Sequence, residues 1–100
     1  MANTYNALFR GAASVGSTTL YTVPSNTKTM VTVILVVNTS SSAQTFSLSL
    51  DGVSIATAVP ISANDTKPLE IKQILAAGKT ITGLASATSV NFHISGLEMV

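Results

Sequence analysis

The stretch Met30–Gly52, MVTVILVVNTSSSAQTFSLSLDG, decides the fold class of this 100-residue chain. Its second half alternates strictly, with Phe46, Leu48 and Leu50 on one face and hydroxyl side chains on the other, which is the pattern of a half-buried strand. Asp51-Gly52 follows and favours a tight hairpin, because both residues tolerate positive φ. We therefore expect antiparallel strands at 45–50 and 53–57, the second extending toward Val59.

The first half of the stretch belongs to a long aliphatic strand over 28–38. Strict alternation divides it into two faces, which are Met30, Thr32, Ile34, Val36 and Asn38 against Val31, Val33, Leu35 and Val37. Both sets are mostly apolar, so both faces need cover. Burying three such side chains is worth roughly 5–9 kcal/mol at ~1.5–3 kcal/mol each. The cover for the second face is either the chain's own N-terminal segment or a loop, or it is another subunit.

The remaining segments are also rich in β-branched residues and turn signals. Strands are expected at 5–13, 17–24, 79–85 and 89–97. The segment 68–77 is ambiguous, because Pro68 and Gly78 fit the ends of a short helix. Leu69 and Ile71 alternate with charged residues there, so a strand over 68–74 is favoured.

This pattern predicts an all-β chain: a single-domain antiparallel β-sandwich of seven to eight strands, either a jelly roll or an Ig-like Greek key. Residues 1–16 form an N-terminal arm or edge strand with a Gly/Ala/Ser link, and residues 17–100 form the sandwich domain. The strand order does not follow from the spacing.

The composition is unusual in its lack of charge. Only 9% of the residues are charged, whereas serine and threonine together number 27. Charge of like sign keeps protein surfaces apart, so a weakly charged surface favours assembly. The net charge is +1 and the basic residues are scattered, which argues against direct binding of nucleic acid.

Targeting and redox signals are missing from the sequence. There is no cysteine, and the first residues lack the basic and apolar regions of a signal peptide. The longest fully apolar run, Val33–Val37, is far below the ~20 residues of a membrane span. We expect a soluble protein made in the cytoplasm, without a membrane partner.

No motif predicts catalysis or cofactor binding. His93 is the only histidine, and one histidine with four scattered carboxylates does not make a metal-ligand set. Asp51 and Asp65 lie in turn contexts, where aspartate serves local hydrogen bonding. We therefore predict a protein that is not an enzyme and that has no catalytic, metal or cofactor site.

Two groups of apolar residues are candidates for contact with another protein. The N-terminal segment carries Tyr5, Leu8, Phe9 and Arg10 ahead of its flexible link, and it packs either on its own body or on a neighbouring subunit. On the long strand, Ile34 and Val36 are the contact candidates. We assign them to the second apolar face, where a sandwich strand normally has polar side chains. Main-chain pairing of the arm with a free sheet edge would fix the register of such a contact.

Four segments together carry a family resemblance. LYTVP (20–24), VVNTSSSAQTFSLSLDG (36–52), ILAAGKTI (74–81) and VNFHISGLE (90–98) resemble small β-sandwich virion proteins of tailed bacteriophages. The similarity covers 17–98. The sequence departs from the family in two loops. After Pro24 the family tends to have Ala-Gly-Lys, and at 63–66 a glycine of the family is missing. Asparagine and aspartate can adopt the same turn conformations as glycine, so the departures concern loop shape.

The resemblance implies a non-enzymatic part of a virion. A capsid decoration (cement) protein is preferred: it would bind the outer head, contact the major capsid protein and stabilise the shell by bridging capsid subunits. It would be a homo-oligomer, with a trimer favoured. A neck, tail or fibre component is the alternative, and a carbohydrate-binding module is a more remote one, since few aromatic residues are available.

Overall fold

The computed structural model describes residues 3–100 of the chain and has eight strands in two antiparallel sheets. The strands are β1 (Asn3–Ala12), β2 (Thr18–Thr22), β3 (Lys28–Asn38), β4 (Gln44–Leu50), β5 (Val53–Ile61), β6 (Thr66–Leu75), β7 (Thr80–Ala85) and β8 (Val90–Met99). The segment 68–77 belongs to strand β6 and the turn after it, so the strand interpretation is confirmed.

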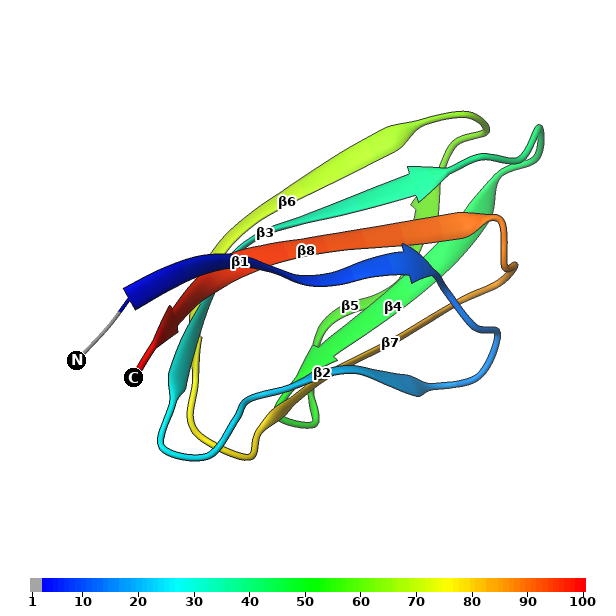
Figure 1. Ribbon diagram of the computed structural model, residues 1–100. Coiled ribbons are helices and arrows are strands. Elements are labelled where there is room, and N and C mark those ends of the chain that lie inside the picture. Colours follow the sequence, from blue (N-terminus) through cyan, green and yellow to red (C-terminus); the bar gives the residue numbers. More distant parts are fainter. Residues whose placement is uncertain (1–2) are drawn as a thin grey trace.

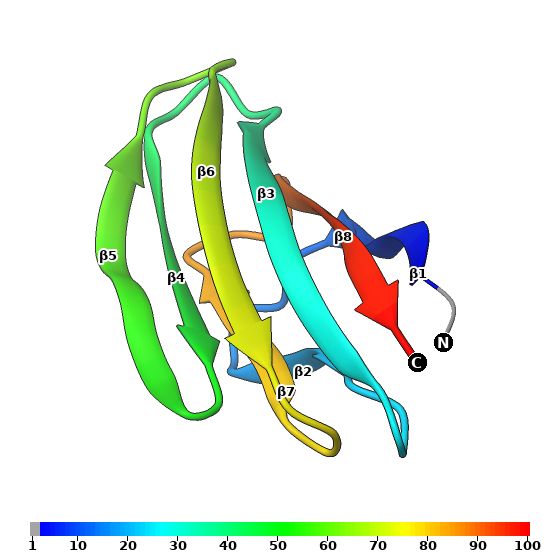
Figure 2. The same cartoon turned by 90° about the vertical axis from the view of Figure 1, so that its left-hand side faces the viewer.

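The two sheets have the orders β1-β8-β3-β6 and β2-β7-β4-β5. Successive strands pass from one sheet to the other except at the β4–β5 hairpin, so the β-sandwich has the connectivity of a jelly roll. Figure 1 shows the two layers, with the start of β1 and the end of β8 at the same end of the molecule. Figure 2 shows β6, β3, β8 and β1 side by side.

Glycine and asparagine form the turns that the sequence predicts. Asp51 and Gly52 have φ values of 53° and 75°, and a type I′ hairpin turn requires positive φ at both positions. Asn26 and Asn64, which stand in the segments that differ from the phage proteins, also have positive φ, at 56° and 55°. Asparagine therefore takes a left-handed conformation in both loops.

The core between the sheets is aliphatic and contains two aromatic rings. Phe46 of β4 and Phe92 of β8 lie edge to face with their centroids 6.4 Å apart, an arrangement that aromatic pairs prefer. Both rings are fully buried among side chains from both sheets. The inward residues of β4 are those that the alternation predicts.

A β-bulge changes the faces of β3 from those expected. The register against β8 shifts between Val31 and Val33, so that Thr32 is an extra residue. As a result, Thr29 and Val31 point inward together with Ile34 and Val36. Strict alternation had placed Val31 on the opposite face, and that assignment was wrong.

A buried asparagine closes the loop end of the sandwich. The Asn38 side chain amide donates to the carbonyl oxygens of Ser42, Ile61 and Ser62, and its oxygen accepts from the amide and hydroxyl of Ser40. Every polar atom of this fully buried side chain is therefore satisfied, which offsets the cost of burying it.

The bulge leaves little room beside Gly96 of β8. A Cβ atom on Gly96 would lie 2.5 Å from the carbonyl oxygen of Met30 and 2.9 Å from Leu8. We expect Gly96→Ala to lower the free energy of unfolding by about 1–3 kcal/mol, the usual cost of overpacking. Urea denaturation measures it. Gly16→Ala is the control, because no atom lies within 4 Å of the added methyl group; equal effects of the two substitutions would contradict the argument.

Candidate interaction surface

The residues expected to make subunit contacts are separated by the structure. Tyr5 is 80% exposed and Arg10 is exposed, both on β1, whereas Leu8 and Phe9 are half-buried and pack against the core. Ile34 and Val36 are completely buried between the sheets. The prediction for Ile34 and Val36 was therefore wrong, because these two side chains already pack inside their own chain.

The N-terminal segment belongs to the sandwich, as edge strand β1 of the β1-β8-β3-β6 sheet. β1 pairs with β8 along its length, from Asn3 opposite Met99 to Ala12 opposite Asn91. It lies beside β8 and away from β3, as Figure 1 shows. It therefore does not cover the outer face of β3. Residues 1 and 2 of the expected arm lie outside the described residues.

The outer face of β3 is an apolar stripe. The outward residues Met30, Val33, Leu35 and Val37 are half-buried by their neighbours. Cross-strand partners share a face of a sheet, and the register adds further apolar residues beside the stripe. The apolar face as a whole comprises Met30, Val33, Leu35, Val37, Pro68, Ile74 and Leu97.

Charged side chains lie along the flanks of the apolar face. The register places Glu70 beside Val33 on one side, and His93 beside Leu35 on the other. Lys72 lies between Glu70 and Ile74 on the same side of β6, and Lys28 lies on the same side of β3 as Met30. Arg10 of β1 lies beyond His93. Ile74, near one end of the face, is 56% exposed. Within residues 3–100, no segment packs over this face as a third layer.

The outer face of the opposite sheet has a different chemistry. One register row crosses all four strands through Thr19, Thr82, Ser49 and Ser54. Together with further residues of β2, β4 and β7 they form the hydroxyl face, which comprises Thr19, Thr22, Ser47, Ser49, Ser54, Thr80 and Thr82. Leu84 also points to this side. Hydroxyl groups exchange hydrogen bonds with water, so this face can remain solvated.

A polar cluster ties three strands of one sheet to the other sheet near the chain ends. The Tyr21 hydroxyl of β2 donates to Glu98 Oε2 of β8 at 2.5 Å, and it lies 2.9 Å from Thr29 Oγ1 of β3. Asn6 Nδ2 of β1 donates to the other carboxylate oxygen of Glu98, also at 2.5 Å. No local sequence pattern predicts this cluster, since Tyr21 and Glu98 are far apart in the chain.

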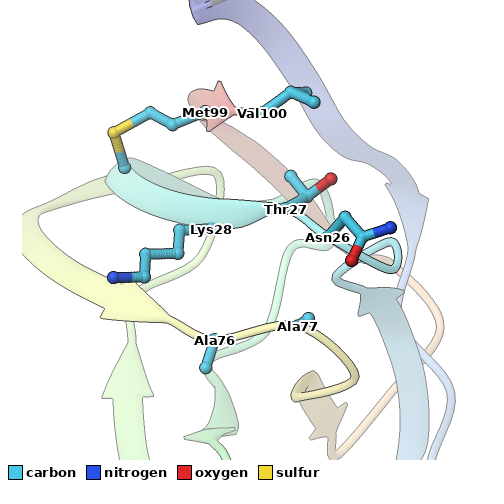
Figure 3. Close-up of a pocket in the computed structure, with 7 residues that line it drawn as sticks. All are labelled: Asn26, Thr27, Lys28, Ala76, Ala77, Met99 and Val100. Atoms are coloured by element: carbon cyan, nitrogen blue, oxygen red, sulfur yellow. The ribbon is translucent and has the colours of Figure 1, made fainter. Parts of the chain in front are cut away.

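A hollow lies at the same end of the sandwich. It has a volume of about 430 Å³ and is lined by two turns and the C-terminal residues, with an apolar wall of Ala76, Ala77, Met99 and Val100. Figure 3 shows Ala76 and Ala77 across from Met99 and Val100, with Lys28 on one flank. Lys28 is its only charged side chain, so the lining supplies no acid–base pair.

The side chains that could bind a metal ion are spread over the described part of the chain. His93 is half-buried on the outer side of its sheet, next to Leu35. Within residues 3–100, no three His, Cys, Asp or Glu side chains cluster closely enough to hold a metal ion. In the same residues, no helix is long and apolar enough to cross a membrane.

Comparisons with known proteins give fold-level likeness alone. No family model and no curated protein sequence matches the chain. An exo-β-1,3-galactanase from Phanerochaete chrysosporium superposes with a TM-score of 0.49 at 14% identity; the match covers 97% of this chain and 29% of the galactanase chain. The CBM35 from Paenibacillus barcinonensis gives a TM-score of 0.37 at 9% identity, over 98% of this chain and 88% of that chain.

The polar cluster generates a pH-dependent prediction. Burial, and then the hydrogen bond to Glu98, raises the pKa of Tyr21 to about 12 from 10.0. The folded chain therefore holds this proton more tightly than the unfolded chain, and the resulting stability is complete below pH 10 and lost between pH 10 and about 12. We expect Tyr21→Phe to cost about 1–3 kcal/mol at pH 7, as for a hydrogen bond to a charged group.

The measurement is urea denaturation at pH 7, 9, 10.5 and 11.5, and the wild type should lose its advantage over Tyr21→Phe across the last two values. Tyr5→Phe is the control, because Tyr5 is 80% exposed. A constant difference between wild type and Tyr21→Phe across the whole range would show that the cluster does not hold the proton.

Proposed function

We propose that this chain is a non-enzymatic structural protein of a tailed-bacteriophage virion, and specifically a capsid decoration protein. It binds the outer head through the apolar face and stabilises the shell by bridging capsid subunits. The observation that carries the proposal is the uncovered apolar stripe of β3, which stands opposite the hydroxyl face. The sequence resemblance to phage virion proteins supports it.

The contrast between the two outer faces fits a protein that is attached on one side. The stripe Met30, Val33, Leu35 and Val37 removes aliphatic area from water only when a partner covers it. Full burial of a Val, Leu or Met side chain is worth ~1.5–3 kcal/mol. The four side chains keep at most about a third of their surface exposed, so completing their burial gains at most roughly 2–4 kcal/mol. The hydroxyl face is then left toward solvent on the outside of the particle.

The proposed contact depends on apolar area and shape. Glu70, Lys72 and Lys28 lie beside the apolar residues of β3 and β6, and His93 and Arg10 lie on the β1 side. The proposed contact rests mainly on the hydrophobic effect of the stripe between these charges, which salt does not screen. The proposed function therefore requires no cofactor and no bound nucleic acid.

A charged substitution in the apolar stripe should weaken attachment to phage heads. We expect Leu35→Lys to weaken binding to purified, undecorated heads at least tenfold, because a charge would be buried in an apolar contact. Co-sedimentation of the protein with heads measures this, in parallel with isolated tails. Ser49→Lys on the hydroxyl face is the matched control and should bind as the wild type does.

The comparison of heads with isolated tails separates the alternative functions. Wild-type protein that sediments with tails and not with heads would exclude the decoration role and assign the chain to the neck, tail or fibre. Wild-type protein that sediments with neither would reject the virion proposal. Head binding that survives Leu35→Lys would show that another surface makes the contact.

Salt should have little effect on the complex. We expect the bound fraction to stay constant, or to rise slightly, between 0.1 M and about 0.5 M sodium chloride, a range that shortens the Debye length from ~10 Å to about half of that. The same co-sedimentation assay measures it. A steep loss of binding with salt would indicate a charge-based contact, contrary to the proposal.

A further inference from the structure

The four edge strands of the sandwich differ in how well they resist pairing with another chain. β6 carries Pro68 near its start and Lys72 further along, and proline and lysine both discourage added strands. β5 contains Pro60 and is distorted at Ala58, whose φ is 47°. β2 has only five residues. Each of these three edges is therefore blunted.

β1 lacks these protective features. It is ten residues long, contains no proline and carries a single charge, on Arg10. Most of its residues are exposed, and only Leu8, Phe9 and Gly11 are half-buried. One side of its backbone pairs with β8 and the other is the edge of the sheet. An open edge of this length is a template for strand addition, and its one irregularity is the bulge between Ala7 and Phe9.

We infer that the β1 edge pairs antiparallel with the β1 edge of a second copy of this chain, about a two-fold axis. A second copy is the expected partner because one pairing register places an aromatic side chain of each copy opposite a cationic side chain of the other. Tyr5 and Arg10 lie opposite Leu97 and His93 of β8, on the outer face of the sheet. In an antiparallel pair centred between residues 7 and 8, each Tyr5 lies opposite Arg10 of the other copy.

This register matches the faces of the sheet on both sides of the bulge of β1. It pairs Asn3 with Ala12 on the outer face, and Thr4 with Gly11 and Asn6 with Phe9 on the inner face, in agreement with their pairing to β8. At the axis itself, Ala7 faces outward and the bulged Leu8 packs toward the core, so this central pair does not share a face. The two-fold axis passes at the Ala7–Leu8 step, where the bulge of β1 lies. Symmetry makes each contact twice, so two Tyr5–Arg10 pairs form.

The Tyr5–Arg10 pair supplies chemical complementarity. A guanidinium group stacks on an aromatic ring favourably, and directly opposed residues have Cβ atoms about 4.5–5.5 Å apart. The Tyr5 ring is 80% exposed in one copy, so it is free to stack. The only charge of β1 meets a ring, and the two copies of Arg10 stay apart.

The pairing joins the two β1-β8-β3-β6 sheets into one sheet of eight strands. Their outer faces, including both apolar stripes, then lie on the same side of the joined sheet. A dimer built this way would present two attachment faces at once, as bridging between capsid subunits requires. The pairing itself rests on β1 alone and holds whether or not the chain acts on a capsid.

The test is sedimentation-velocity ultracentrifugation of the pure full-length chain over a range of concentrations. We expect the wild type to be a dimer and Tyr5→Arg to weaken it at least tenfold, because the substitution places two cations opposite each other. Combining Tyr5→Arg with Arg10→Glu restores opposite charges and should recover the dimer. Val53→Arg on the exposed β5 edge is the matched control and should leave it unchanged.

Circular dichroism melting curves verify that each variant is folded. A wild type that stays monomeric at its highest soluble concentration would overturn the inference, as would a trimer. So would a dimer that Tyr5→Arg leaves intact, or one that the double substitution fails to restore. None of these results depends on virion particles, so failure here is distinct from failure to bind heads.

Discussion

The bulge at Thr32 is the constraint on which both surfaces of the β1-β8-β3-β6 sheet depend. It inserts one residue into β3 opposite β8, so inward and outward positions exchange along the strand. Val31 and Ile34 consequently face the same core, although they are three residues apart. Thr32, the one polar residue in a run of eight, is kept out of that core, and its hydroxyl donates to the carbonyl oxygen of Ser95.

The same bulge accounts for the apolar face. Beyond Thr32 the alternation resumes in the shifted phase, which seals Ile34 and Val36 between the sheets and turns Val33, Leu35 and Val37 outward. A chain with two aliphatic faces on one central strand can bury only one of them within a two-layer sandwich. The apolar face is therefore a consequence of the composition of β3. The topology leaves this face uncovered because the N-terminal segment is an edge strand of the same sheet.

The strands and turns could be predicted from local pattern, since alternation and positive-φ residues act over a few positions. Thr45–Leu50 and the Asp51-Gly52 turn are examples. The faces of β3 could not, because a bulge depends on how two strands pair, here on the space that Gly96 leaves for the Met30 carbonyl. For that reason the sequence-based prediction assigned Ile34 and Val36 to a contact surface, although both are buried between the sheets. The Tyr21–Glu98 contact escaped prediction for a similar reason, since it joins strands from different sheets that the sequence does not place together.

The surfaces that matter here are distributed over strands that are far apart in the chain. Leu97, Leu35 and Pro68 become neighbours only through the pairing of β8, β3 and β6, so no short motif announces them. In the proposed dimer, the single charge of the β1 edge lies where the two-fold partner offers an aromatic ring. Both proposals thus draw their specificity from the face and the edge that the pairing of these strands leaves open.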